Sequence, residues 1–296
     1  MILLNRVCIP LGLQCNMNCK YCYRDFCRRK LPTELSDCVK EYLKQLDPLK
    51  TECVCMSGGE PLIYWSKIKE IFSYVPENVH KKIMTNGLLL TDEIVDYVNK
   101  YNVEICLSHD GEQTKFLRGI DIFENDKILE LCRKIKILMV TSVITNRNED
   151  VMANFRYIRN KLQRNNFVYR YCDLMNTGNV NDLLKDFDYA LYARSSREYT
   201  LFYKKENPFY NRVERKGGYA PAGFNVDLDG NIVGMNTLVK YGTIYNTFDE
   251  CYQKMLEIDN NFCKDKHCPI FTECNGLRQA SDEHYCKCQK IRMGWS

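Results

Sequence analysis

Six short hydrophobic runs recur between Ile2 and Cys172, and stretches with a helical pattern separate them. Val, Ile, Leu and Met dominate the runs, which is typical of parallel strands buried on both faces of a sheet. The predicted strands are Ile2–Cys8, Cys53–Met56, Lys82–Thr85, Val103–Ser108, Lys136–Ser142 and Phe167–Cys172.

Amphipathic helices are predicted between these strands. The segment Thr33–Leu46 places its hydrophobic residues on one helical face, and Val151–Leu162 does the same. Thr91 is a suitable N-cap for a further helix. Six βα units predict an α/β fold, a partial (β/α)6 barrel of the TIM type, whose chemistry lies at the carboxyl ends of the strands.

The pattern changes near Gly217. From Phe224 to Val233 hydrophobic and polar residues alternate around Asp229-Gly230, which predicts a β-hairpin. A cysteine-rich tail follows. We therefore expect two units: a barrel over residues 1–216, including a helix at 186–206, and a small module over residues 217–296.

Composition excludes several classes of protein. No run of about eighteen apolar residues occurs, so no membrane span is predicted. The start MILLNRVCIP lacks the features of a secretory signal, which predicts a cytoplasmic protein. The net charge of +4 gives little reason to expect nucleic-acid binding.

Cysteine is the unusual component, with 17 residues in a chain of 296. A reduced cytosolic protein does not use so many cysteines as a disulfide framework. Three crowd together near the start and five near the end, at positions 263, 268, 274, 286 and 288. Two such groups predict two metal sites.

Cys15, Cys19 and Cys22 follow the first predicted strand directly. Three thiolates can hold three irons of a four-iron cluster, which leaves the fourth iron open to a small molecule with an amine and a carboxylate. The alternative is a zinc loop completed by Cys27 or by a distant residue.

A second motif, Ser57-Gly-Gly-Glu-Pro61, follows the next predicted strand. Paired glycines allow a ligand to approach the backbone closely because they carry no Cβ. The carboxylate of Glu60 is suited to bind an ammonium group. Both motifs are expected at the same end of the barrel.

These two motifs resemble the signature of radical S-adenosylmethionine (SAM) enzymes: C-x3-C-x2-C with an aromatic residue, here Tyr21, before the last cysteine, and then a GGE-type motif. The segments Met84–Thr91 and Leu107–Gly111 are also similar to the subgroup that modifies peptides and proteins. The resemblance covers nearly the whole chain.

The resemblance implies a role for each matching residue. The three cysteines would ligate a [4Fe–4S] cluster, and SAM would bind its open iron. Gly58, Gly59 and Glu60 would hold the SAM amine, Tyr21 would lie near the adenine, and Ser108 and Arg118 would contact other parts of SAM. An electron donor such as flavodoxin or ferredoxin would reduce the cluster, and cleavage of SAM would give a 5′-deoxyadenosyl radical that abstracts a hydrogen atom from the substrate.

The cysteine-rich tail resembles the auxiliary-cluster modules called SPASM or twitch domains. Non-cysteine residues at Ala222, Met235 and Arg278 imply that one of two auxiliary sites has been lost. Cys263, Cys268, Cys274 and either Cys286 or Cys288 would hold the remaining [4Fe–4S] cluster. A structural zinc site with four thiolates is the alternative.

Three further residues are candidates for catalysis. Cys172 and Cys251 could each donate a hydrogen atom to a substrate radical, although ordinary burial explains them as well. His109 beside Asp110 could act as an acid or base, or its neighbours could satisfy it structurally.

The resemblance favours a ribosomally synthesised peptide as substrate, with epimerisation, a thioether or a carbon–carbon cross-link as the outcome. The first predicted strand begins at Ile2, so no recognition domain is expected before the barrel, and a separate leader-peptide-binding protein is a possible partner. Two alternatives remain: a radical SAM dehydrogenase of small molecules, and a non-catalytic iron–sulfur or zinc protein that senses redox state.

Overall fold

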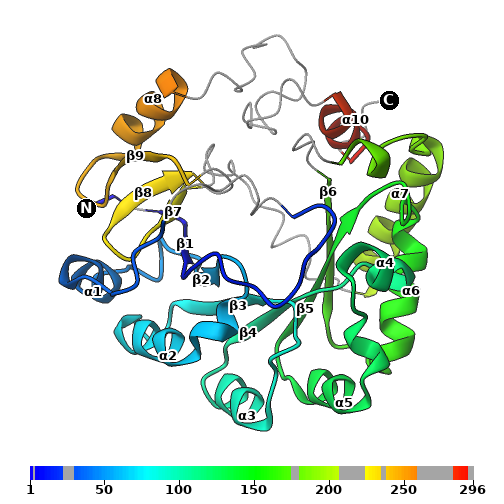
Figure 1. The fold of residues 1–296 in the computed structure, drawn as a ribbon, viewed down its shortest axis with the longest axis horizontal. Helices are drawn as coiled ribbons and strands as arrows, with labels where there is room; N and C mark the ends of the chain where they lie inside the picture. Colours follow the sequence, from blue (N-terminus) through cyan, green and yellow to red (C-terminus); the bar gives the residue numbers. More distant parts are fainter. Residues whose placement is uncertain are drawn as a thin grey trace.

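The computed structural model describes residues 1–2, 4–22, 30–174, 180–206, 224–234, 238–258 and 283–292. In these residues, nine strands form one curved sheet in the order β6-β5-β4-β3-β2-β1-β7-β8-β9 (Figure 1). The strands are β1 Arg6–Pro10, β2 Cys53–Ser57, β3 His80–Thr85, β4 Glu104–Ser108, β5 Leu138–Ile144, β6 Val168–Asp173, β7 Phe224–Val226, β8 Asn231–Gly234 and β9 Lys240–Thr243.

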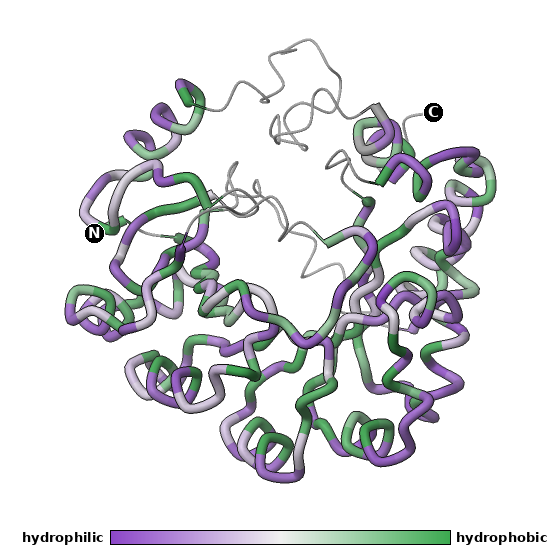
Figure 2. Tube along the Cα trace, viewed as in Figure 1, coloured by the Kyte–Doolittle hydropathy of each residue, from purple (hydrophilic) through white to green (hydrophobic). Residues whose placement is uncertain are grey.

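Strands β1 to β6 are parallel and lie in sequence order, which confirms the predicted partial barrel. Helices cover the outer face of this part of the sheet (Figure 1). The helices of the described residues are α1 Asp37–Lys44, α2 Trp65–Tyr74, α3 Asp92–Lys100, α4 Thr114–Arg118, α5 Asp126–Lys134, α6 Val151–Leu162, α7 Tyr189–Glu206, α8 Phe248–Ile258 and α10 Glu283–Arg292. Of these, α8 lies beside β9 and α10 beside α7. Along α1, α3 and α5 hydrophobic and hydrophilic residues recur within each turn, as expected for amphipathic helices on the outside of a barrel (Figure 2).

Several predicted elements begin later than their sequence patterns indicate, among them α7, which begins at Tyr189 and not at residue 186, and the shift is largest for the first strand and the first helix. The first strand begins at Arg6, because the buried Ile2 instead donates its backbone N–H to the carbonyl of Ile244, just beyond β9 (2.7 Å). The first helix begins at Asp37, because Ser36 binds the carbonyl of Leu228 through both its backbone N–H and its hydroxyl.

The two faces of the parallel strands differ in chemistry. Residues such as Val7, Val54 and Ile105 belong to the hydrophobic core under the helices. Because side chains alternate along a strand, the intervening residues point to the concave side. This inner face carries Arg6, Cys8, Cys53, Cys55, His80, Lys82, Glu104, Cys106, Thr141, Arg170 and Cys172, together with the apolar Met84, Met139, Val143 and Val168. The strands are therefore hydrophobic toward the helices but largely polar and thiol-bearing toward the inside.

The predicted hairpin is present and is continuous with the barrel sheet. Strand β7 pairs in parallel with β1, at Cys8 and Asn225, and antiparallel with β8. Gly230 turns the hairpin with a φ of 80°. The start of a second module near Gly217 remains a prediction.

The end of the described chain returns to the β6 side of the barrel, where α10 lies beside α7 (Figure 1). Arg292 donates a hydrogen bond to Asp173 at the end of β6 (3.2 Å). None of the helices in the described ranges is long and apolar enough to cross a membrane.

Candidate active site

The segment from Leu11 to Cys22, which we call the cluster loop, follows β1 and carries three half-buried thiols, those of Cys15, Cys19 and Cys22. Backbone hydrogen bonds join this loop to the segment after β2. Gly59 N–H donates to the Gly12 carbonyl and Glu60 N–H to the Gln14 carbonyl, both at 2.8 Å. The two predicted motifs therefore lie side by side at the carboxyl ends of β1 and β2.

The glycine pair is needed for contact between these two backbones. A Cβ on Gly58 would lie 2.4 Å from the Gly12 oxygen, and one on Gly59 would lie 2.2 Å from the Gln14 oxygen. Gly58 also has a φ of 123°. The sequence predicted that a ligand approaches this backbone closely. The structure shows that the backbone of the cluster loop approaches it closely as well.

Asn86, which follows β3, connects a third strand to the cluster loop. Its side-chain amide donates to the Asn16 oxygen (2.8 Å) and contacts the Cys15 sulfur (3.7 Å). A backbone N–H from Met17 also points at that sulfur, at 3.4 Å. Hydrogen bonds to sulfur are one of the means by which proteins set the reduction potential of an iron–sulfur cluster.

In the described ranges, no three His, Cys, Asp or Glu side chains converge closely enough to hold a single metal ion. A [4Fe–4S] cluster does not need that convergence, because each thiolate binds a different iron. The zinc alternative would take a fourth ligand from Cys27 or a distant residue, and Cys27 lies outside the described residues. Burial raises the pKa of the Cys19 thiol, and the Arg118 guanidinium opposes that shift.

Glu60 is 1% exposed and links the glycine motif to β3. Its carboxylate accepts hydrogen bonds from Leu62 N–H (3.0 Å), the Thr85 hydroxyl (2.7 Å) and Asn86 N–H (2.8 Å). Burial raises the pKa of this carboxyl. A carboxylate has about four acceptor positions, so three protein donors leave about one for a ligand ammonium. Its contact with SAM stays a prediction.

The carboxylate of Asp110, just after β4, joins the cluster loop to the neighbouring strands. It is buried and accepts hydrogen bonds from the Tyr21 hydroxyl, from Arg118 Nε (2.7 Å) and Nη2 (3.2 Å), and from Val143 N–H (2.8 Å). The Arg118 guanidinium also lies 5.4 Å from the centre of the Tyr21 ring. Tyr21 is therefore fixed through its hydroxyl.

Ser108 and Arg118 were expected to contact SAM. Ser108 ends β4, is half-buried and points to the inner face, close to the level of the cluster loop. Arg118 is buried, and Asp110 already binds it with two hydrogen bonds. Both lie on the side of the barrel where the motifs meet, and their roles toward SAM stay predictions.

His109 lies on the helix side of the sheet and is completely buried. Its Nε2 bonds Asp121 (2.9 Å), its Nδ1 bonds the Thr114 hydroxyl (2.9 Å), and its ring stacks on Phe123. This environment favours a structural role for His109 over a role as a catalytic acid or base.

Burial lowers the pKa of His109, so its unfolded state takes up a proton first as the pH falls. The stability that the neutral histidine contributes should be complete above about pH 6.5, its unfolded value, and be lost below that. We expect the free energy of unfolding to fall less between pH 7.5 and 5.5 in His109→Gln than in the unchanged chain. Urea unfolding at both pH values measures this, and an equal fall in both proteins would contradict it.

Cys172 and Cys251 lie in different surroundings. Solvent reaches Cys172 on the inner face of β6, but the protein atoms around its sulfur raise the pKa of the thiol to about 12. Cys251 in α8 is completely buried, and a Cβ on Gly242 would lie 2.7 Å from its sulfur. Of these two thiols, only that of Cys172 is accessible from the inner face. The position of Cys251 is explained by ordinary burial.

The tail cysteines are described only in α10. There Cys288 is buried, with its sulfur 3.6 Å from His284, and Cys286 is half-buried. Two residues apart on a helix, they point in different directions. Cys263, Cys268, Cys274 and Cys27 lie outside the described residues, as do Ala222, Met235 and Arg278.

Two residues that organise the site, Asn86 and Asp110, had no predicted contact with the cluster loop, although the segments Met84–Thr91 and Leu107–Gly111 that contain them were singled out. Both follow predicted strands at the carboxyl end of the barrel, where polar residues are candidates for function. That position and the resemblance of both segments to the peptide-modifying subgroup were the available signals. The hydrogen-bond partners of these two residues could not be predicted, because the partners lie on loops that are separate in the sequence.

Comparison with known proteins agrees with this geometry. The family model of the radical SAM superfamily matches residues 9–190. The chain is 26% identical over 249 residues to the GTP 3′,8-cyclase of Aquifex aeolicus, covering 77% of this chain and 72% of the cyclase. It is 28% identical over 159 residues to the uncharacterized protein MJ0907 of Methanocaldococcus jannaschii, covering 48% of this chain and only 54% of that relative.

Two solved structures share the fold at low sequence identity. Native anSMEcpe with bound AdoMet and the Kp18Cys peptide has a TM-score of 0.68 at 18% identity, covering 98% of this chain and 96% of that one. Streptococcus suis SuiB bound to the precursor peptide SuiA has a TM-score of 0.60 at 16% identity, covering 85% and 65%. From the family match, together with the paired motifs at the barrel edge, we conclude that this chain belongs to the radical SAM superfamily, a family of enzymes for which SAM and a [4Fe–4S] cluster are implied.

Proposed function

We propose that this enzyme abstracts a hydrogen atom from a ribosomally synthesised peptide and thereby starts an epimerisation, a thioether or a carbon–carbon cross-link. The observation that carries the proposal is the polar inner face of the sheet beside the cluster loop. A closed barrel fills its interior with layers of branched hydrophobic residues. Here most of the corresponding positions carry thiols, hydroxyls and charges beside a few Met and Val side chains, which suits contact with a polar substrate such as a peptide.

Several inner-face groups already bind one another. Lys82 forms an ion pair with Glu104 (2.8 Å), which also bonds His80 (2.9 Å), and Cys106 bonds the Thr141 hydroxyl (3.1 Å). Arg170 is exposed, and its guanidinium has no ion pair with any carboxylate in the described ranges. It is the group best placed to bind a substrate carbonyl or carboxylate.

When bound, SAM and the cluster supply a 5′-deoxyadenosyl radical, and the chain's own residues position the reaction. The cysteines would ligate the cluster, the glycine motif and Glu60 would hold the SAM amine, and the inner face would orient the peptide. The fold shared with proteins whose structures contain bound peptides supports a peptide substrate. The electron donor and a separate leader-binding protein are further proposed partners.

The test uses a panel of short peptides prepared with deuterated amino acids, which includes the product of any short open reading frame that adjoins this gene. Incubation with the reconstituted enzyme, SAM and dithionite should transfer deuterium into 5′-deoxyadenosine and change the peptide's mass or its stereochemistry. Formation of 5′-deoxyadenosine without deuterium transfer would argue against this substrate class.

A small-molecule substrate is the second candidate. The cyclase relative, which the chain matches over 72% of its length, is named for a reaction on GTP. Arg170 on the inner face is also compatible with a small anion. Deuterium transfer from a small molecule, with none from peptides, would favour this alternative. Family membership leaves no support for a non-catalytic redox sensor.

We also propose one auxiliary [4Fe–4S] cluster held by Cys263, Cys268, Cys274 and either Cys286 or Cys288. Cys286 is the better candidate for the last ligand because Cys288 is buried beside His284. Full ligation by protein would suit this cluster to electron transfer or structural support.

Iron counting after anaerobic reconstitution tests the auxiliary site. We expect about eight irons and no zinc per chain, and about four irons in Cys286→Ala. The matched variant Cys288→Ala should keep about eight irons but unfold more easily, since it leaves a cavity. About four irons with one zinc in the unchanged chain would instead make the tail a structural zinc site.

A further inference from the structure

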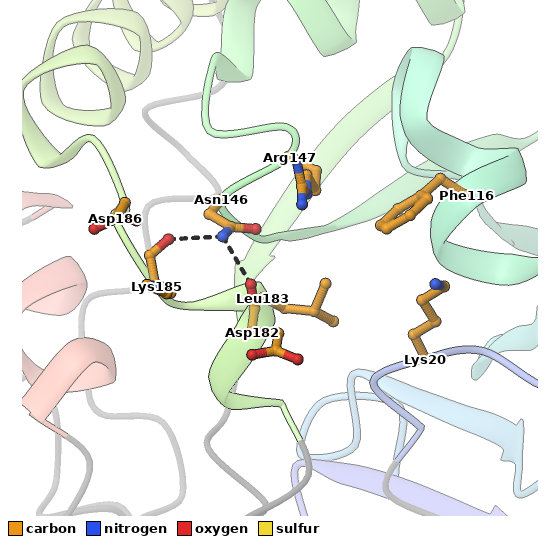
Figure 3. Close-up of a pocket in the computed structure, with 8 residues that line it drawn as sticks. All are labelled: Lys20, Phe116, Asn146, Arg147, Asp182, Leu183, Lys185 and Asp186. Atoms are coloured by element: carbon orange, nitrogen blue, oxygen red, sulfur yellow. Dashed lines mark hydrogen bonds between the residues drawn. The ribbon is translucent and has the colours of Figure 1, made fainter.

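A pocket of about 780 Å³ opens beside the cluster loop, where that loop meets α4 and the segments after β5 and β6. Lys20, Phe116 and Arg147 form one side of the pocket, which we call the basic edge (Figure 3). Lys185, Asp182 and Asp186, from and just after η5 (Asn181–Leu183), form the other side (Figure 3).

The basic edge presents an exposed aromatic ring between two cations. Phe116 is 43% exposed. The Lys20 ammonium lies 4.0 Å and the Arg147 guanidinium 5.4 Å from the centre of its ring. Within the described residues, Lys20, Arg147 and Lys185 form no ion pair with any carboxylate, although all three are exposed. Their charges are therefore free to meet acidic groups of a partner.

This surface adjoins the predicted cluster directly. Lys20 lies between Cys19 and Tyr21, and its backbone N–H donates to the Leu117 carbonyl in α4 (2.9 Å). A redox cofactor carried by a protein docked here would come close to the cluster. None of the residues that line the pocket belongs to the inner face of the sheet, so docking would not require that face.

We propose that the basic edge and Lys185 form the docking surface for an acidic electron-carrier protein. This inference rests on the proposed function. In the step concerned, the carrier's reduced cofactor loses one electron and the oxidised cluster gains it, with no transfer of atoms. An acidic partner is favoured because complementary charges steer association, and the exposed Phe116 ring supplies an apolar contact.

Asp182 and Asp186, across the pocket from the basic edge, would repel an acidic partner. Removing one of these negative charges should therefore strengthen docking. Asp186 has a φ of 54°, a conformation that Asn also tolerates. Asp186→Asn should therefore keep the backbone and make docking faster.

The experiment compares two reductants on the reconstituted full chain with SAM, reading 5′-deoxyadenosine. One is an acidic flavodoxin kept reduced by its reductase, below saturation. The other is dithionite, at a concentration where the rate no longer depends on it. The variants are Arg147→Glu combined with Lys185→Glu, and Asp186→Asn. The matched control is Lys50→Glu, an exposed lysine that precedes β2 at the opposite end of the barrel.

In the double charge-reversal variant, the flavodoxin-driven rate should fall about tenfold at low salt, and the loss should shrink at about 0.5 M salt. Its dithionite-driven rate should stay within about twofold of the unchanged chain, and Lys50→Glu should change neither rate by more. Asp186→Asn should raise only the flavodoxin-driven rate.

Equal losses with both reductants, or no loss with either, would overturn the docking surface. The docking surface would also be overturned if the unchanged chain formed 5′-deoxyadenosine with dithionite but not with flavodoxin. An unchanged chain that forms no 5′-deoxyadenosine with dithionite would instead contradict the proposed function.

Discussion

Replacing Asp110 with asparagine is expected to destabilise the protein by about 3–5 kcal/mol and to prevent the cluster loop from retaining iron. The Asp110 carboxylate is the buried counter-charge of Arg118, and both lie deep in the structure. Removing one partner of a buried ion pair leaves the other charge uncompensated, which is the costly case. The same carboxylate accepts a hydrogen bond from the hydroxyl of Tyr21, which lies between Cys19 and Cys22 in the sequence.

Tyr21→Phe is the matched control, because it removes one hydrogen bond to Asp110 and leaves the ion pair intact. The expected loss is about 1.5–3 kcal/mol. Anaerobic urea unfolding and iron retention during gel filtration measure both variants. Similar small losses in the two variants would show that Asp110 does not organise the loop.

Replacing Gly59 with alanine should lower the rate of SAM cleavage at least about a hundredfold, because the cluster loop and the glycine motif must move apart. The added Cβ would lie 2.2 Å from the Gln14 oxygen and 2.6 Å from the Leu13 oxygen, and both atoms belong to the backbone. The hydrogen bonds that join the loops, such as Gly59 N–H to Gly12, cannot survive that displacement.

Gly119→Ala separates this effect from backbone strain. Gly119 has a φ of 86°, but nothing lies within 4 Å of an added Cβ. The variant should lose about 1–2 kcal/mol of stability and still bind iron. Activity of Gly59→Ala close to that of the unchanged chain would show that the two loops can separate without harm.

The sequence predicted most of the fold because the strands and helices have strong local patterns. Thr91 caps α3 as expected, accepting a hydrogen bond from Ile94 N–H (3.3 Å). The beginning of β1 was wrong by four residues, since the hydrophobic Ile2 packs near β9. The hydrophobic pattern of a sequence does not show whether a buried residue belongs to a strand or packs beside that strand.

The site was predictable as a set of motifs but not as a network. The proximity of the cysteine and glycine motifs follows from the rule that parallel strands end at one edge. The engagement of Glu60 with Thr85 and Asn86 depends on where the β3 loop places two donors. The burial of His109 beside Phe123 likewise depends on how the chain folds back 14 residues further on.

The most direct measurement is 5′-deoxyadenosine formed from SAM by the anaerobically reconstituted, dithionite-reduced chain, compared with Cys19→Ala and with Cys251→Ala. Cys251 is buried in α8 and serves as a cysteine control. We expect 5′-deoxyadenosine in the unchanged chain and in Cys251→Ala, and none above background in Cys19→Ala. Formation that persists in Cys19→Ala, or is absent from the unchanged chain, would contradict a radical SAM site at the cluster loop.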